Sequence, residues 1–231
     1  MGNGVDRWGA VSVCERFGGE GAVGMNRRGA VFLMLGAILA WPARGDAPPA
    51  VSEQARQVVQ DTTNRTLAVL KGERELLRQH PDRIYSLVDT IILPHFDFTR
   101  MSRWVLGRLW REASEDQRRR FVEEFRTLLV RTYATALLEY VDQTVEVLPL
   151  RGDASGSDVV VRTEVRQPGA PPLPIHYSMS AESGDWMVYD VTIDGISLVA
   201  SYRSTFSSEA AKGGLDHVIT LLEQRNRDAR R

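Results

Sequence analysis

The side chains that could bind a metal or act as nucleophiles are few and scattered in this sequence. The four histidines, His80, His95, His176 and His217, do not occur at the spacing at which two histidines ligate one metal ion. Cys14 is the only cysteine, so the chain can form neither an intramolecular disulfide nor a thiolate zinc site. The nucleophile motifs G-x-S-x-G and S-x-x-K are absent. Signals for an enzyme are therefore weak.

Two aspartates remain as candidates for acid–base chemistry. An enzyme with an internal cavity could use Asp97 or Asp190 as a base and Tyr133 or Tyr177 as an acid. We interpret Asp97, together with its neighbour His95, as a helix-cap and loop pair instead. The other carboxylates are scattered over solvated helix faces, so the enzyme stays an alternative and no catalytic residue, metal or cofactor is predicted.

One glycine-rich stretch imitates a cofactor motif. Residues 19–24 read Gly-Glu-Gly-Ala-Val-Gly and match G-x-G-x-x-G. A dinucleotide fingerprint needs a strand before it, a helix after it and an acidic residue about 20 positions further on. Here a secretory signal follows instead, so we expect no nucleotide cofactor. The net charge of −1 gives no reason to expect nucleic acid as a partner.

The N-terminal part resembles a targeting segment. Residues 25–45 carry Arg27 and Arg28 near their start. An apolar run follows, Gly29–Trp41, which is shorter than the roughly 20 residues of a membrane span. Small residues then stand at the −3 and −1 positions of a cleavage site before Asp46. We predict a cleaved signal peptide and a periplasmic protein, with an uncleaved anchor as the alternative.

The stretch upstream of this signal fits no signal architecture. Residues 1–24 are rich in glycine and contain acidic residues such as Asp6 and Glu20. We interpret them as a non-native upstream extension, with Met25 as the true start, although Met1 stays possible. Residues 46–231 then form a single domain. At 43% hydrophobic residues the composition is that of a globular protein.

The element around which the domain is organised is a long amphipathic helix over residues 114–140. Ser114 and Gln117 have the spacing of a capping box at its start. Apolar residues then recur on one helix face: Phe121, Phe125, Leu128, Leu129, Tyr133, Ala136, Leu137 and Tyr140. This broad stripe is either ordinary core or one wall of a cavity.

Other helices precede and follow it. We predict a first amphipathic helix over residues 52–71, a second that Pro81 opens and Pro94 stops, and a short one capped by Thr99 that ends at Gly107. Near the C-terminus, residues 196–211 return to helical spacing. The pair Gly213-Gly214 then breaks the chain before a final short helix.

Between these helices the apolar period changes to two. Four segments alternate and are separated by turn residues: 144–149, 158–166, 175–180 and 186–193. Four consecutive strands with short turns predict an antiparallel meander. The fold class is therefore α+β, with several amphipathic helices packed on one face of a four-stranded sheet. Such a pairing can be solid or can enclose an apolar cavity, and the pattern leaves both open.

Two long segments, residues 92–140 and 186–206, and the Gly213-Gly214 break resemble a known family. They are similar to the MlaC-type periplasmic phospholipid-binding proteins, the toluene-tolerance auxiliary family. With the signal peptide, the resemblance extends over residues 46–225. The strand region between the two segments is its least specific part.

This resemblance implies a monomeric lipid carrier without catalytic residues or cofactor. Members of the family take phospholipid acyl chains into a hydrophobic cavity and shuttle them between outer and inner membranes, which maintains outer-membrane lipid asymmetry. The implied partners are an inner-membrane ABC transporter with an MCE-domain subunit and an outer-membrane lipoprotein complex. Two alternatives are a carrier of another lipid, such as a hopanoid, and a periplasmic adaptor with a solid core.

The lipid-binding wall is expected where the helix stripe and the apolar strand faces meet. The residues predicted to form it are Trp104, Val105, Leu129, Tyr133, Leu137, Val147, Val161, Tyr177, Met179 and Val188. The last strand is ambiguous, because the pairs Trp186/Val188 and Tyr189/Val191 are both apolar. Choosing Val188 for the wall is therefore a guess about which face turns inward.

Overall fold

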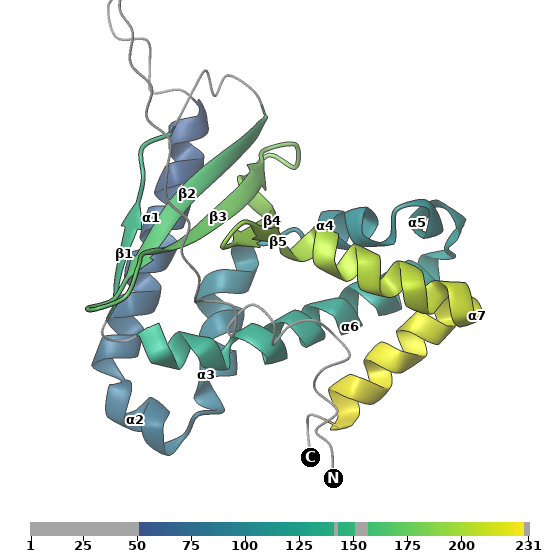
Figure 1. Ribbon diagram of the computed structural model, residues 1–231, viewed down its shortest axis with the longest axis horizontal. Coiled ribbons are helices and arrows are strands. Elements are labelled where there is room, and N and C mark those ends of the chain that lie inside the picture. Colours follow the sequence, from purple (N-terminus) through teal and green to yellow (C-terminus); the bar gives the residue numbers. More distant parts are fainter. Residues whose placement is uncertain (1–50, 141–142, 151–156, 229–231) are drawn as a thin grey trace, which may run out of the picture. The chain divides into compact units, whose positions relative to one another are not determined.

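A five-stranded antiparallel sheet with helices on one face makes up the part of the chain that the computed structural model describes (Figure 1). That part comprises residues 51–140, 143–150 and 157–228. It belongs to a unit that extends from Ala50 to Arg231. The predicted signal peptide and the upstream extension lie outside the described residues. The α+β class predicted from the periodicity is confirmed.

The sheet has its strands in chain order, each antiparallel to the next: β1 Thr144–Val147, β2 Asp158–Arg166, β3 Leu173–Ser180, β4 Met187–Ile193 and β5 Ile196–Ser197. The two-residue strand β5 is an addition to the predicted meander. Asp194 and Gly195 both have positive φ angles, 50° and 79°, which is the geometry of a tight hairpin turn. Ile196 therefore pairs with Ile193 and does not start the following helix.

A bulge in β4 decides which of its side chains face the helices. Tyr177 pairs with Val191 and Met179 with Val188, so β4 has one residue more than β3 between these two pairs. The extra residue reverses the alternation. As a result Val188 and Val191 are both buried among the inward-facing side chains, whereas Tyr189 stacks on a neighbouring helix outside them. The sequence left open whether the pair Trp186/Val188 or the pair Tyr189/Val191 faces inward. In the structure, members of both pairs, Val188 and Val191, lie on the inside.

The helical elements fall before and after the sheet. In chain order they are α1 Val51–Gly72, α2 Arg74–Gln79, α3 Arg83–Leu87, the π-helical segment η1 Val88–Ile92, the 3-10 segment η2 Leu93–His95, α4 Phe98–Leu106, α5 Arg108–Glu112, α6 Glu115–Tyr133, the 3-10 segment η3 Thr135–Tyr140 and α7 Leu198–Asp228. Helix α1 contacts β1 and β2, while α4 and α7 contact β4 (Figure 1). None of these described helices is long and apolar enough to cross a membrane.

The capping box at the start of α6 is confirmed, but the helix is shorter than predicted. The Gln117 N–H donates to Ser114 Oγ at 3.2 Å, and the Ser114 N–H donates to Gln117 Oε1 at 2.9 Å. The α-helix ends at Tyr133, and Thr135–Tyr140 continues as a 3-10 helix. Such tightening is common at helix C-termini. Leu137 is therefore on η3 and not on the long helix.

The segment between residues 81 and 107 also departs from its prediction. Pro94 has no N–H to continue an α-helical ladder, and the chain before it divides into α3, η1 and η2. Asp97, not Thr99, caps the next helix, since its carboxylate accepts the Arg100 N–H at 2.8 Å. A carboxylate at this position also favours the positive end of the helix dipole. The predicted end of α4 at Gly107, with a φ of 55°, is confirmed.

Arg100 connects α4 to the ends of two strands. Its guanidinium donates to Asp158 Oδ1 at 2.8 Å, Ser180 Oγ at 2.7 Å and Glu182 Oε2 at 2.8 Å, and lies 4.3 Å from the centre of the Tyr189 ring. Its side chain is only 16% exposed, so these contacts are partly shielded from water. Arg100 and its partners Asp158 and Glu182 thus join α4 to the sheet, and they are not among the apolar side chains that face the helices.

Helix α7 is held against α6 by an aromatic cluster and bends once. Phe125 contacts Tyr202 and Phe206 edge to face, with ring centroids 5.2 and 5.8 Å apart, a favourable arrangement for buried rings. Beyond this cluster Gly213 and Gly214 leave helical geometry. The break predicted from the glycine pair is confirmed, and the final turns of α7 pack in a second direction (Figure 1).

We predict that Gly214→Ala destabilises the protein through its backbone. Gly214 has φ 72° and ψ −170°, a region that is essentially restricted to glycine, and the strain should lower the free energy of unfolding by about 1–3 kcal/mol. Gly72→Ala is the matched control, because an added Cβ there meets nothing within 4 Å at the end of a regular helix. Urea unfolding measures both variants. Equal midpoints would contradict the predicted strain.

Candidate functional site

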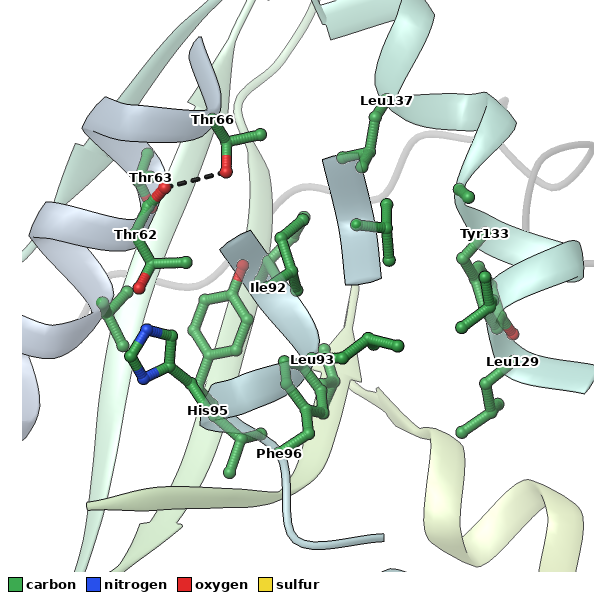
Figure 2. A pocket seen from close by; sticks show the side chains of 18 of the residues that line it. Thr62, Thr63, Thr66, Ile92, Leu93, His95, Phe96, Leu129, Tyr133 and Leu137 are labelled. Carbon is green, nitrogen blue, oxygen red and sulfur yellow. Dashed lines mark hydrogen bonds between the residues drawn. The ribbon is translucent and has the colours of Figure 1, made fainter. Parts of the chain in front are cut away.

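An apolar cavity lies between the helices and the inner face of the sheet (Figure 2). Its volume is about 290 Å³. Protein interiors contain few voids larger than one water molecule, and an engineered apolar cavity of about 150 Å³ is already large enough to bind benzene. The interior of this protein is therefore not the solid core that an adaptor would have.

The wall of the cavity is uncharged. The sheet contributes Val145, Val165, Ile175, Tyr177, Met179, Val188, Val191 and Ile193. Helices α1, α4, α6 and α7, the segments η1, η2 and η3, and the connecting residues Phe96 and Ala134 supply the rest, mostly valine, leucine, alanine and phenylalanine. Among the described residues that line it there is no aspartate, glutamate, lysine or arginine. Such a wall suits an apolar ligand and offers an ionic one no partner.

Two separate hydrophobic clusters border the cavity, and α1 contributes to both. Val59 packs in a cluster with the sheet that includes Val161 and Trp186. About three turns later, Leu70 packs in a second cluster with α2, α3 and η1 that includes Ile84. Because one rigid helix belongs to both clusters, it fixes the spacing between the sheet and the helical segments. The cavity occupies the gap between the two.

The structure brings six of the ten predicted wall residues together. They are Leu129, Tyr133, Leu137, Tyr177, Met179 and Val188. Figure 2 shows Leu129, Tyr133 and Leu137 in a row on one side of the cavity, on α6 and η3. That these six side chains contact a lipid stays a prediction.

The other four predicted residues do not line the cavity. Trp104 is 49% exposed and stacks on Tyr189 at a centroid distance of 6.0 Å. Val105 and Val161 are buried within solid packing, and Val147 lies against the cluster that contains Val161. Periodicity identifies the apolar face of an element but not which part of that face meets the void. Phe98 and Met101, which precede Trp104 and Val105 on α4, are the residues of this helix that line the cavity.

Sequence reasoning missed several contributors to the wall. Among them are α1, which supplies Val58, Thr62 and Thr66, and the segment around η2, which supplies His95 and Phe96. The apolar stripe of α1 is visible in the sequence but gives no sign of facing a void. The two threonines four residues apart within that stripe are the one signal that could have drawn attention to it.

The acid–base pair of the enzyme alternative is not assembled. Asp97 caps α4, while Asp190 accepts the Ser197 hydroxyl at 2.6 Å and the Val199 N–H at 3.0 Å at the start of α7. Neither carboxylate lines the cavity, in which both candidate acids, Tyr133 and Tyr177, are found. Both aspartates therefore have structural partners, as predicted for Asp97.

Burial dominates the electrostatics of the tyrosine on α6. Removal from water raises the pKa of Tyr133 well above its ordinary value, and the neighbouring Tyr202 hydroxyl, to which it is hydrogen-bonded, raises it further. Burial is also the main cause of the raised pKa of Tyr202. Both phenols are neutral at physiological pH, so Tyr133 adds no charge to the wall there.

The fold and the cavity together define an α+β protein built to hold an apolar ligand between a sheet and helices. The chain belongs to the MlaC family, because the model of the MlaC protein matches residues 60–224. A relative from Pseudomonas putida, the toluene tolerance protein ttg2D, is 29% identical over 166 residues, which cover 71% of this chain and 77% of the relative.

Two further proteins extend the comparison. The intermembrane phospholipid transport system binding protein MlaC of Haemophilus influenzae is 24% identical over 179 residues, covering 76% of this chain and 84% of that protein. A solved structure of the phospholipid-binding protein from Ralstonia solanacearum, in complex with a phospholipid, is 33% identical. It superimposes with a TM-score of 0.71 over 77% of this chain and 99% of its own.

The raised pKa of Tyr133 predicts a loss of stability in alkali. Above pH 10, the ordinary value for tyrosine, the unfolded chain releases this proton while the folded protein retains it, so the free energy of unfolding falls as the pH rises. Tyr133→Phe cannot ionise and should show a shallower fall between about pH 9 and 11. Urea unfolding across this range measures the effect. The same slope in both proteins would show that Tyr133 does not contribute.

Proposed function

We propose that this protein is a periplasmic carrier that holds phospholipid acyl chains in the cavity and transports them between the outer and inner membranes. The observation that carries the proposal is the uncharged apolar cavity in a chain of the MlaC family. The similarity to the phospholipid-bound protein from Ralstonia solanacearum supports phospholipid as the ligand. Outer-membrane lipid asymmetry is the property that such transport would maintain.

The energetics of lipid transfer fit such a wall. Each methylene buried away from water contributes about 0.8 kcal/mol, so two acyl chains represent roughly 20–25 kcal/mol of transfer free energy. A carrier has to shield most of this apolar surface and still release the lipid. Apolar side chains provide the shielding, while the lack of a cation on the described wall avoids a strong bond to a phosphate.

The cellular setting of the proposal has separate support. The predicted signal peptide over residues 25–45 favours the periplasm. The name of the Haemophilus influenzae relative favours a multi-component transport system. An inner-membrane ABC transporter with an MCE-domain subunit and an outer-membrane lipoprotein complex stay predicted partners, as does the monomeric state. A hopanoid or another lipid is the alternative cargo.

Lipid analysis of the purified protein tests the function directly. We expect mass spectrometry of an extract from natively purified protein to find phospholipid in stoichiometric amounts. Incubation with phospholipid vesicles should load protein that has been stripped of lipid. A protein that neither retains nor takes up phospholipid would refute the carrier, and retention of a hopanoid alone would favour the alternative cargo.

Leu137→Arg distinguishes a cavity from a core. Leu137 is half-buried on η3 and lines the cavity, so the arginine stem can lie along the wall while its charge reaches water. We expect a loss of about 1 kcal/mol, or about 2–4 °C in melting temperature, together with the loss of bound phospholipid. In a solid core the same change would cost several kcal/mol and unfold much of the protein.

The matched control places the same charge on the other side of the sheet. Val160 is 49% exposed on β2, between the inward-facing Val159 and Val161, so Val160→Arg should retain both stability and lipid. Circular dichroism and lipid extraction are measured on both variants. A folded Leu137→Arg protein with its normal lipid content would rule out acyl chains at this part of the wall.

A further inference from the structure

The apolar wall contains a small group of hydrogen-bonding side chains at one end. Thr62, Thr63 and Thr66 come from consecutive turns of α1, and His95 comes from η2. Figure 2 shows these residues on the opposite side from Leu129, Tyr133 and Leu137, with the Thr62 hydroxyl directed toward the His95 imidazole. A wall that only shielded hydrocarbon would need none of these groups.

Several of the polar groups on the wall already have protein partners. The Thr66 hydroxyl is buried and donates to the Thr62 carbonyl oxygen at 2.8 Å. The Tyr133 hydroxyl is paired with Tyr202. In contrast, no hydrogen bond within the described part of the chain joins the Thr62 hydroxyl or the His95 imidazole to another protein group. Both side chains are half-buried, so a ligand in the cavity can reach them.

The chemistry of the Thr62 hydroxyl and the His95 imidazole indicates which ligand groups they can bind. A threonine hydroxyl and an imidazole N–H are both hydrogen-bond donors, and both suit an uncharged oxygen acceptor such as a carbonyl. A phosphate would need a cation, and the described wall has no lysine or arginine. In an acyl lipid the neutral acceptors are the ester carbonyl oxygens, which lie where the hydrocarbon chains begin. A carbonyl carried into an apolar cavity without a donor would be strongly disfavoured.

We infer that Thr62 and His95 bind the ester carbonyl oxygens of the lipid and make the cavity selective for ester-linked acyl chains. This rests on the proposed function, since it concerns the same cavity. The two donors then hold the start of the acyl chains beside α1 and η2. The phosphate and head group remain outside the uncharged wall.

Competition between two phospholipids that differ only at this linkage tests the inference. Stripped protein is incubated with vesicles that contain equal amounts of an ester-linked and an ether-linked phosphatidylcholine with the same chain lengths, and mass spectrometry measures the bound ratio. An ether oxygen is a poorer acceptor than a carbonyl. We expect the wild type to prefer the ester by about tenfold, as for one or two neutral hydrogen bonds.

Substitutions at Thr62 and His95 test whether these two residues cause the preference for the ester. Thr62→Val removes the hydroxyl and keeps the shape, and His95→Phe keeps a ring without a donor; together they should bring the ratio close to one. Thr90→Val is the matched control and should retain the preference, because Thr90 is exposed on η1 outside the cavity and its hydroxyl already donates to the Ser86 carbonyl oxygen at 2.8 Å. Circular dichroism and the total amount of bound lipid show that each variant is folded and loaded.

The outcomes separate the two proposals. Equal binding of ester and ether lipid by the wild type would overturn the ester site but leave the carrier intact. An unchanged preference in Thr62→Val would also overturn it, and this single variant is sufficient if proteins that carry His95→Phe fail to fold. No uptake of either lipid would refute the carrier itself.

Discussion

The structure depends on keeping two hydrophobic clusters apart around an uncharged cavity. At about 24 cal/mol for each Å³, an empty cavity of 290 Å³ would cost roughly 7 kcal/mol, a large part of the 5–15 kcal/mol that stabilises a typical domain. A bound apolar ligand can recover that free energy without a single strong polar contact. The same balance allows the ligand to leave once another apolar environment is available.

Helix α1 and two sets of contacts outside the wall maintain the gap. Helix α1 takes part in both clusters, Phe125 anchors α7 to α6, and Arg100 joins α4 to Asp158 and Glu182. These ionic and aromatic contacts do not line the cavity, so they stabilise its frame without adding charge to its interior. A frame held from outside can accept cargo of varied shape, because its stability does not depend on side-chain contacts across the void.

Within the wall, polarity is limited to neutral groups. The carboxylates that an enzyme could have used, Asp97 and Asp190, cap α4 and α7. Tyr133 is hydrogen-bonded to Tyr202. Thr62 and His95 remain as donors on the cavity wall. This distribution suits recognition of the linkage at the start of the acyl chains better than either catalysis or capture of a phosphate.

Local patterns in the sequence determined the order of elements, the α+β class, the capping box of α6 and the break at Gly213-Gly214, because each depends on residues close in the chain. Tertiary packing decided the rest. The bulge that brings both Val188 and Val191 inward depends on pairing with β3, and the outward position of Trp104 depends on its contact with Tyr189. Periodicity gives the apolar side of each element. Where facing elements leave a void is decided only by long-range contacts, so the sequence alone could not tell a cavity from a solid core.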